Sequence, residues 1–470
     1  MTESLKPYAK YKSSGSSWIG YVPDSWRVQN LRALIKSRAA RNRADLPLLS
    51  VARERGVFVR SLEGADANHN VIPEDLSNYK VARQGDLVIN KMKAWQGSMG
   101  IAPCDGIVSP AYFVYEFGIS NRDYGERLLR SWPYVAHFAH ASDGVRIGQW
   151  DLTIRGMREI PVVIPPDEEQ ISIAAFLDGM DRKIMRFLKD KQKMIQLLEE
   201  QRISIVDRAV TVGIDPSVNL GPTGIEWLKC APENWRVIRA KNIFECVDVR
   251  SKSGQEELLT VSSERGIVPR NSTTVMMFKA ETYVGHKLCW PGDLVINSLW
   301  AWSRGLGVSK YHGIVSTAYG VYRLRAGAAV DERFVHELLR SRAFQWELQV
   351  RSKGIWKSRL QLTDDSFLSS PLVIPPLDEQ LAIIDFINKE TALLENALDQ
   401  ARSELSLIRD FRKRLIADVV TGKLDVREAA RMLDPIVSNE PTLDHFELLT
   451  ESELEEEESL DEDDMEEAQQ

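Results

Sequence analysis

Long hydrophobic runs are missing from this 470-residue sequence, and its N-terminus has no apolar segment. We therefore expect neither a membrane-spanning helix nor a secretion signal. Cysteine is scarce, and the four residues, Cys104, Cys230, Cys246 and Cys289, form no Cys-x-x-Cys pair. No histidine lies at zinc-ligand spacing beside them, so we expect reduced thiols, a cytoplasmic protein, and no metal or cofactor.

Catalytic motifs are also missing. An adenine methyltransferase holds its base with Asn- or Asp-Pro-Pro-aromatic, but the Pro-Pro pairs at 165–166 and 375–376 follow Ile and precede Asp or Leu. The Gly-Lys pair at 422–423 lacks the upstream glycine of a phosphate-binding loop, and Arg340 interrupts the His-Glu-x-x-His pattern that begins at 336. We expect no intrinsic catalysis.

Charge is distributed unevenly along the chain. Residues 438–470 contain 15 acidic side chains and no Lys or Arg, and without them the net charge of −8 becomes +7. A mildly basic body is compatible with phosphate binding. We expect the acidic tail, within 425–470, to be disordered and dispensable for folding. It either aids solubility or competes with a polyanion for the basic loops.

An internal repeat of about 210 residues is the most informative feature of the sequence. The segment 85–115 aligns with 292–322 without a gap, and 17 of the 31 positions are identical. The Trp-x-x-x-x-Pro-x-x-Trp openings at 18–26 and 227–235 also match, as do Pro-x-Val-Ile-Pro-Pro at 161–166 and 371–376. The chain is a tandem duplication.

Each repeat has a globular part followed by a long helix. Short apolar runs separated by Gly, Asn and Asp predict a mixed α/β (α+β) domain. The Pro-Pro pairs suit the first turn of a helix, and the acidic residues after them suit its positive end. We divide the chain into globular domains at 1–165 and 214–375, helices at 166–213 and 376–424, and the tail.

Apolar residues recur at heptad spacing in both helical segments, in the same register 210 residues apart. Such a stripe predicts two coiled-coil helices that partner each other, antiparallel about a pseudo-twofold axis. The alternative is that each helix packs on its own domain. The predicted seam consists of Leu177, Met180, Ile184, Phe187, Met194, Leu198 and Ile205, and of Ile387, Leu394, Ala397, Ala401, Ile408, Phe411 and Leu415.

Three motifs carry a resemblance to a known family. They are the Trp-x-x-x-x-Pro-x-x-Trp openings, Gly-Asp-Leu-Val-Ile-Asn at 85–90 and 292–297, and Ile-Pro-Pro-x-x-Glu-Gln before each long helix. In duplicated order over about 15–425, they resemble the specificity subunit of a type I restriction-modification enzyme. The acidic tail is outside that pattern.

The resemblance implies two target recognition domains that read a bipartite, asymmetric site on double-stranded DNA. It also implies assembly with two modification subunits, which methylate adenine, and with restriction subunits, which cleave DNA. A different class remains open at this stage: a duplicated coiled-coil scaffold that bridges two partners without reading DNA.

Residues that read bases should differ between the copies, while the scaffold stays alike. Arg and Lys suit guanine, and Asn and Gln suit adenine. The differing positions lie in two matched loops, which could equally be surface loops that drifted. The shared Trp95 and Trp302 belong either to the core or to stacking platforms. The candidate DNA contacts are Arg53, Arg60, Lys91, Lys93, Gln96, Ser98, Arg146, Gln149, Ser298, Trp300, Ser303, Arg304, Lys353, Lys357 and Arg359.

Overall fold

The computed structural model describes residues 5–60, 75–144, 150–263, 265–270, 282–354 and 360–432. They form two compact units: the first contains residues up to Gln192 and those from Ser403 onward, and the second contains Lys193–Arg402. Within the described residues, no helix is both long and apolar enough to cross a bilayer. Residues 433–470 of the predicted tail lie outside the described residues. Residues 425–432 differ from the expected disorder, since Val426 is buried and a short helix, α9 (Arg427–Arg431), follows it.

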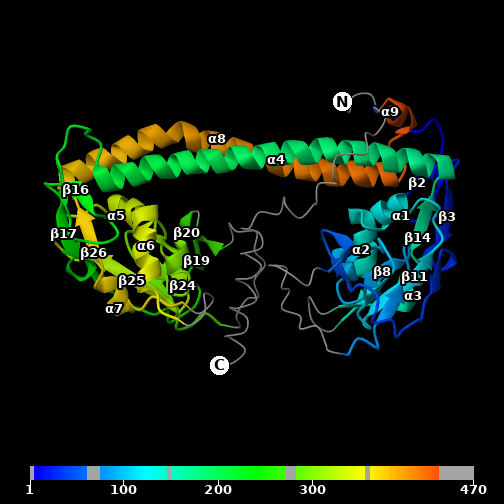
Figure 1. The fold of residues 1–470 in the computed structure, drawn as a ribbon, viewed down its shortest axis with the longest axis horizontal. Helices are drawn as coiled ribbons and strands as arrows, with labels where there is room; N and C mark the ends of the chain where they lie inside the picture. Colours follow the sequence, from blue (N-terminus) through cyan, green and yellow to red (C-terminus); the bar gives the residue numbers. More distant parts are fainter. Residues whose placement is uncertain are drawn as a thin grey trace. The chain divides into compact units, whose positions relative to one another are not determined.

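The first unit contains small antiparallel sheets, short helices, the start of one long helix and the end of the other (Figure 1). Its elements are β1 (Tyr11–Ser13), β2 (Tyr21–Pro23), β3 (Arg27–Asn30), η1 (Leu31–Ala33), β4 (Ile35–Ser37), β5 (Leu49–Ala52), β6 (Gly56–Val59), β7 (Lys80–Ala82), β8 (Leu87–Asn90), η2 (Ala94–Gln96), β9 (Met99–Ile101), β10 (Gly106–Val108), β11 (Tyr112–Phe117), α1 (Arg122–Leu129), α2 (Trp132–His140), β12 (Ser142–Asp143), β13 (Asp151–Leu152), α3 (Ile154–Arg158), β14 (Pro161–Ile164) and the first part of α4 (Asp167–Val212).

The second unit repeats this order closely. Its elements are the rest of α4, β15 (Leu220–Pro222), β16 (Cys230–Pro232), β17 (Arg236–Arg239), η3 (Ala240–Asn242), β18 (Phe244–Cys246), β19 (Leu259–Ser262), β20 (Gly266–Pro269), β21 (Lys287–Cys289), β22 (Leu294–Asn297), η5 (Ala301–Ser303), β23 (Leu306–Val308), β24 (Gly313–Val315), β25 (Tyr319–Leu324), α5 (Glu332–Leu339), α6 (Arg342–Arg351), α7 (Asp364–Leu368), β26 (Pro371–Ile374) and the first part of α8 (Leu377–Val420). After α8, α9 (Arg427–Arg431) belongs to the first unit.

A four-stranded antiparallel sheet forms the centre of each unit. Its strand order is β4-β11-β8-β9 in the first unit and β18-β25-β22-β23 in the second. The inner strands β8 and β22 both have the sequence Leu-Val-Ile-Asn, and their apolar side chains are buried. A strand covered on both faces reads as such a continuous apolar run. The shared Gly-Asp-Leu-Val-Ile-Asn motif is therefore the core of the scaffold.

The other two shared motifs meet at the start of each long helix. The indole of Trp26 donates to Glu169 at 3.0 Å, and that of Trp235 donates to Glu379 at 2.8 Å. Gln170 donates to the carbonyl of Pro165 and accepts from the backbone N–H of Asn121. These contacts attach the long helix to its own domain, which explains why the motifs occur in both copies.

The two long helices lie side by side and run antiparallel within each unit (Figure 1). In the first unit, Asp181 of α4 pairs with Arg412 of α8, and Lys191 pairs with Glu404. In the second, Arg202 pairs with Glu395. Residue numbers therefore rise along α4 as they fall along α8, and the predicted antiparallel helix pair is confirmed.

The predicted seam has two series, and one of them is buried or half-buried along both helices. In that series Leu177, Ile184, Ile387, Ala401 and Leu415 are buried, and Leu198, Ile205, Leu394 and Ile408 are half-buried.

The other series is wrong by one residue. Phe187, Met194 and Phe411 are 42%, 40% and 38% exposed, and the neighbouring Leu188 and Arg412 occupy the seam instead. Met180 and Ala397 are likewise less buried than the residues after them, Asp181 and Leu398. A search for apolar residues alone missed seam positions at which ion-paired side chains face each other.

Candidate nucleic-acid interface

The first predicted loop has the same backbone design in both units. It leaves β8 or β22, forms a single 3-10 turn and returns in β9 or β23. The side-chain oxygen of Asn90 accepts from the N–H of Met92, and the indole of Trp95 donates to the carbonyl of Met92 at 3.1 Å. Asn297, Leu299 and Trp302 repeat both contacts. The shared Asn and Trp therefore hold the loop, whichever residues it presents.

The side chains that this first loop presents are basic and polar. Lys93 is exposed, Gln96 is half-buried, and Lys91 forms an ion pair with Asp151 at 2.8 Å. Met92, which we did not predict, is 54% exposed at the same place. Ser98 is only 2% exposed, so the prediction that it contacts DNA is not supported: its position belongs to the floor of the loop.

The equivalent loop of the second unit is aromatic. Trp300 stacks on Trp302 with ring centroids 5.6 Å apart, and Ser303 is half-buried beside them. Arg304 has a φ of +63°, where the first unit has Gly97. Ser298 is buried and donates to the carbonyl of Ala318 at 2.9 Å, so it too is not supported as a DNA contact.

The second predicted loop joins the first in each unit. The N–H of Leu152 donates to the carbonyl of Lys91 at 2.8 Å, and the rings of Trp150 and Trp95 are 5.3 Å apart. The N–H of Leu362 donates to Ser298 in the same way, at 2.9 Å. Arg146, Gln149, Lys357 and Arg359 lie outside the described residues, and they stay predictions.

The remaining candidates occupy other places. Arg53 is exposed at the turn between β5 and β6 and forms an ion pair with Glu54 at 3.3 Å. Arg60 is half-buried just after β6. This strand pairs with β5 in a hairpin and contacts β9. Lys353 is exposed and pairs through its backbone with Gln361, next to the second loop of its unit.

A basic pair shared by both units escaped the sequence analysis. Arg41 forms a β-bridge with Lys80, as Arg250 does with Lys287. Lys80 donates to the carbonyl of Tyr112 at 2.5 Å, and Lys287 donates to its equivalent at 2.6 Å. Burial lowers the pKa of Lys80, and the positive charges of Arg41 and Lys91 lower it further. A search for differing residues could not find this pair, since both copies keep it. An alignment of residues 41–80 with 250–287 would have shown that both copies keep this Arg and Lys.

Comparison with known proteins relates the chain to one family. The type I restriction enzyme MjaVIII specificity subunit of Methanocaldococcus jannaschii is 23% identical over 292 residues, which are 57% of this chain. The match spans 63% of that relative's length. No family model matches.

A solved structure shares the fold. A chain from a structure on complex assembly and conformational transition of the type I R-M system covers 86% of this chain and 99% of its own, with a TM-score of 0.57 and 13% identity. The HsdS subunit from Thermoanaerobacter tengcongensis covers 86% of this chain with a TM-score of 0.39 and 15% identity. The duplicated motifs, the paired long helices and the curated relative together identify the chain as a homologue of the specificity subunits of type I restriction enzymes.

Proposed function

We propose that this chain is the DNA-reading, non-catalytic subunit of a type I restriction-modification system. Each unit reads one half of a bipartite DNA site, and the two halves differ in sequence. One observation carries the proposal: a duplicated scaffold holds unlike side chains in the same loop. Lys93 and Gln96 lie on one copy of this loop, and Trp300 and Ser303 lie on the other.

Shared and differing cations have different roles in this proposal. Arg41 and Lys80, with Arg250 and Lys287, occur in both units and contact phosphates, which carry no sequence information. The differing residues of the loops reach base edges, where Lys suits guanine and Gln suits adenine. The aromatic pair of the second unit suits apolar contact with a base instead.

The partners in this proposal are two modification subunits, which methylate adenine, and restriction subunits, which cleave DNA. The relative's identity as a specificity subunit supports this assignment. In this proposal the chain itself contributes no catalytic step. It acts in the cytoplasm, where it can bind DNA.

A pair of matched variants tests base reading against phosphate binding. Replacing Lys93 and Gln96 with Ala should relax the preference at the first half-site alone, at about 1–3 kcal/mol for each lost bidentate contact. The control Lys80→Ala should weaken binding to all sequences alike and reduce the salt dependence by about one phosphate contact. Binding to a library of bipartite sites, by the complex assembled with its modification subunits, separates the two effects. Loss of preference at both half-sites would contradict the proposal, and no binding to any duplex would favour the scaffold class.

The long helices set the gap between the half-sites in this proposal, since α4 and α8 each contribute to both units. One heptad inserted into each helix keeps the seam aligned and adds about 10 Å. That length equals roughly three base pairs, which also turn the far half-site by about 100°. The variant should prefer a longer gap with weaker binding, or lose specific binding while folded. Undiminished affinity for the original gap would exclude the helices as the ruler.

A further inference from the structure

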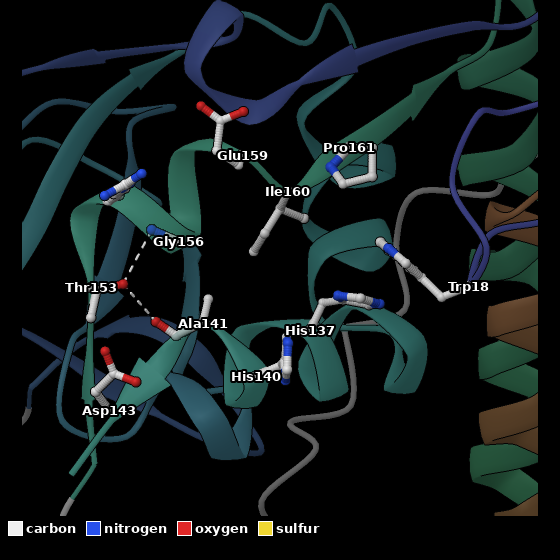
Figure 2. Close-up of a pocket in the computed structure, with 11 residues that line it drawn as sticks. Trp18, His137, His140, Ala141, Asp143, Thr153, Gly156, Glu159, Ile160 and Pro161 are labelled. Atoms are coloured by element: carbon white, nitrogen blue, oxygen red, sulfur yellow. Dashed lines mark hydrogen bonds between the residues drawn. The ribbon is translucent and has the colours of Figure 1, made fainter.

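A cavity of about 530 Å³ opens in the first unit, next to β12 and β13, which flank the second predicted loop. The end of α2 and the start of α3 form its base, and the loop around Trp18 forms one side. Figure 2 shows open space between Ala141, Ile160 and His137, with Glu159 and Asp143 at the edges. Trp18 and Pro161 of the duplicated motifs line part of this space, but none of the proposed DNA contacts within the described residues does.

The second unit fills the equivalent place with an arginine side chain. Arg351 stands where the first unit has Ala141, one residue before the matched Ser-x-Gly at 142–144 and 352–354. Its Nε donates to Glu347 at 2.5 Å, and its Nη1 donates to Ser369 Oγ at 2.9 Å and to the carbonyl of Ser366 at 3.2 Å. The guanidinium thus connects the end of α6 to Ser366 within α7 and to Ser369, which directly follows α7.

The surrounding backbone is alike in the two units, so the comparison holds locally. Thr153 caps α3 by accepting from Gly156 at 3.1 Å, and Thr363 caps α7 by accepting from Ser366 at 3.3 Å. A β-carbon built on Gly156 would lie 3.0 Å from the β-carbon of Ala141. The methyl of Ala141 therefore faces the segment that Arg351 bonds in the second unit, and an arginine there would extend over the cavity.

The chemistry of the cavity suits a guanidinium. Glu159 stands where the second unit has Ser369, so a carboxylate replaces a hydroxyl as acceptor. It already accepts from Asn30 and Arg32 at 2.9 Å each, yet its side chain remains 55% exposed. Trp18 covers His137 with ring centroids 3.5 Å apart. Burial and the neighbouring His140 lower the pKa of His137, which leaves a neutral imidazole at neutral pH. Arg155 and Asp143 also line the cavity.

We propose that this cavity binds the guanidinium group of an arginine side chain from another protein chain, which takes the place that Arg351 fills within the second unit. The site is a docking point for a protein partner and does not depend on whether the loops read DNA. It is specific to the first unit, so it would distinguish the two otherwise similar domains for that partner. A charged planar group is required, because its donors must reach Glu159 and the carbonyls of α3 together.

Calorimetric titration of the full chain with N-acetyl-arginine amide tests the proposal. We expect one saturable site, at least tenfold weaker binding of N-acetyl-citrulline amide, which has the same shape without the charge, and no preference for agmatine. The variant Ala141→Arg should fill the cavity from within and weaken binding at least tenfold, while Arg351→Ala should create a second site. Glu159→Gln weakens binding without adding volume, and this result stands even if Ala141→Arg fails to fold.

Three results would overturn the proposal. The first is the absence of saturable binding to the unaltered chain. The second is equal binding of the citrulline compound, or unchanged binding in a folded Ala141→Arg or Glu159→Gln chain. The third is tenfold tighter binding of agmatine than of the arginine amide, which would assign the cavity to a small cationic molecule instead of a protein side chain. The DNA-binding variants of Lys93 and Gln96 should leave all of these results unaltered.

Discussion

The two units differ where each globular domain contacts the long helices. In the first unit, Arg127 of α1 donates to Asp181 of α4 at 2.5 Å and also pairs with Asp178. Arg412 of α8 donates to the other oxygen of Asp181 at 2.8 Å. Burial alone would raise the pKa of Asp181, but the two guanidinium groups hold it below its usual value. The carboxylate of Asp181 thus joins domain and helices.

In the second unit the charges are exchanged. Glu337 of α5 stands at the position of Arg127, and Thr391 at that of Asp181. Arg202 stands at the position of Arg412 and forms an ion pair with Glu395 at 3.1 Å. Burial raises the pKa of Glu337, although Arg202 and Arg340 offset part of that cost. One scaffold has therefore produced an ion-paired junction and a junction with a poorly solvated carboxylate.

Removal of Arg127 should have the largest effect. Arg127→Ala leaves Asp181, whose side chain is 10% exposed, with one of its two cations, so we expect a loss of about 3–5 kcal/mol in the first unit. Hydrogen exchange followed by mass spectrometry should show faster exchange in α1, with α5 unchanged. The matched variant Glu337→Ala should leave the exchange of α5 nearly unaltered. Equal loosening of α1 and α5 by their own variants would show that the charges do not distinguish the junctions.

The apolar seam next to the first junction should come second. Leu188 is 6% exposed and Phe187 is 42% exposed, although Phe187 is the larger side chain. Leu188→Ala should lower the free energy of unfolding by about 2–4 kcal/mol, and Phe187→Ala by less than about 1 kcal/mol. Urea denaturation of both variants measures the difference. If Phe187→Ala lowers the free energy of unfolding more than Leu188→Ala does, then Phe187 occupies the seam, as the apolar pattern predicted.

The helix seam also shows which parts of the fold can be predicted from the sequence and which cannot. Duplicated motifs and heptad spacing predict the two domains and the antiparallel helices, because backbone packing repeats with them. The second seam series is not predictable from hydrophobicity, since Asp181 and Arg412 enter the seam through their mutual ion pair. Such a pair is recognisable only when both helices and their direction are known.

The predicted loops show a similar limit. Comparison of the copies identified a loop with the same backbone in both units, in which Lys93 and Trp300 hold equivalent positions, and its role in reading DNA stays a prediction. It did not separate the exposed positions from Ser98 and Ser298, because burial in a short turn depends on which way each side chain leaves the backbone. It also missed Arg41 and Lys80, whose partnership depends on a β-bridge between distant segments.

Acid should move the two junctions in opposite directions. The pKa of Asp181 is lowered, so its contribution is present at neutral pH and is lost as pH falls through the folded-state value. The pKa of Glu337 is raised, so its contribution appears below the unfolded-state value and is absent at neutral pH. Between pH 7 and about 4, exchange protection should therefore rise in α5 while α1 changes little, and α1 should lose protection mainly below about pH 4. A parallel change in both helices, after correction for intrinsic exchange rates, would contradict the comparison.

The smallest expected effect comes from neutralising Glu337 itself. Glu337→Gln keeps the shape and removes the charge that burial disfavours, so at pH 7 we expect a gain in stability of no more than about 1 kcal/mol. The gain stays small because Arg202 and Arg340 attract the carboxylate and lose that attraction in the variant. The more telling result is the pH dependence: α5 in the variant should no longer gain protection on acidification, while α1 should behave as before. Asp181→Asn in the first unit should have the opposite sign at pH 7, a loss, because it removes a charge that two cations stabilise. If Glu337→Gln destabilises the second unit as Asp181→Asn destabilises the first, then Glu337 is a bound partner of Arg202, and the two junctions are alike in strength although opposite in charge.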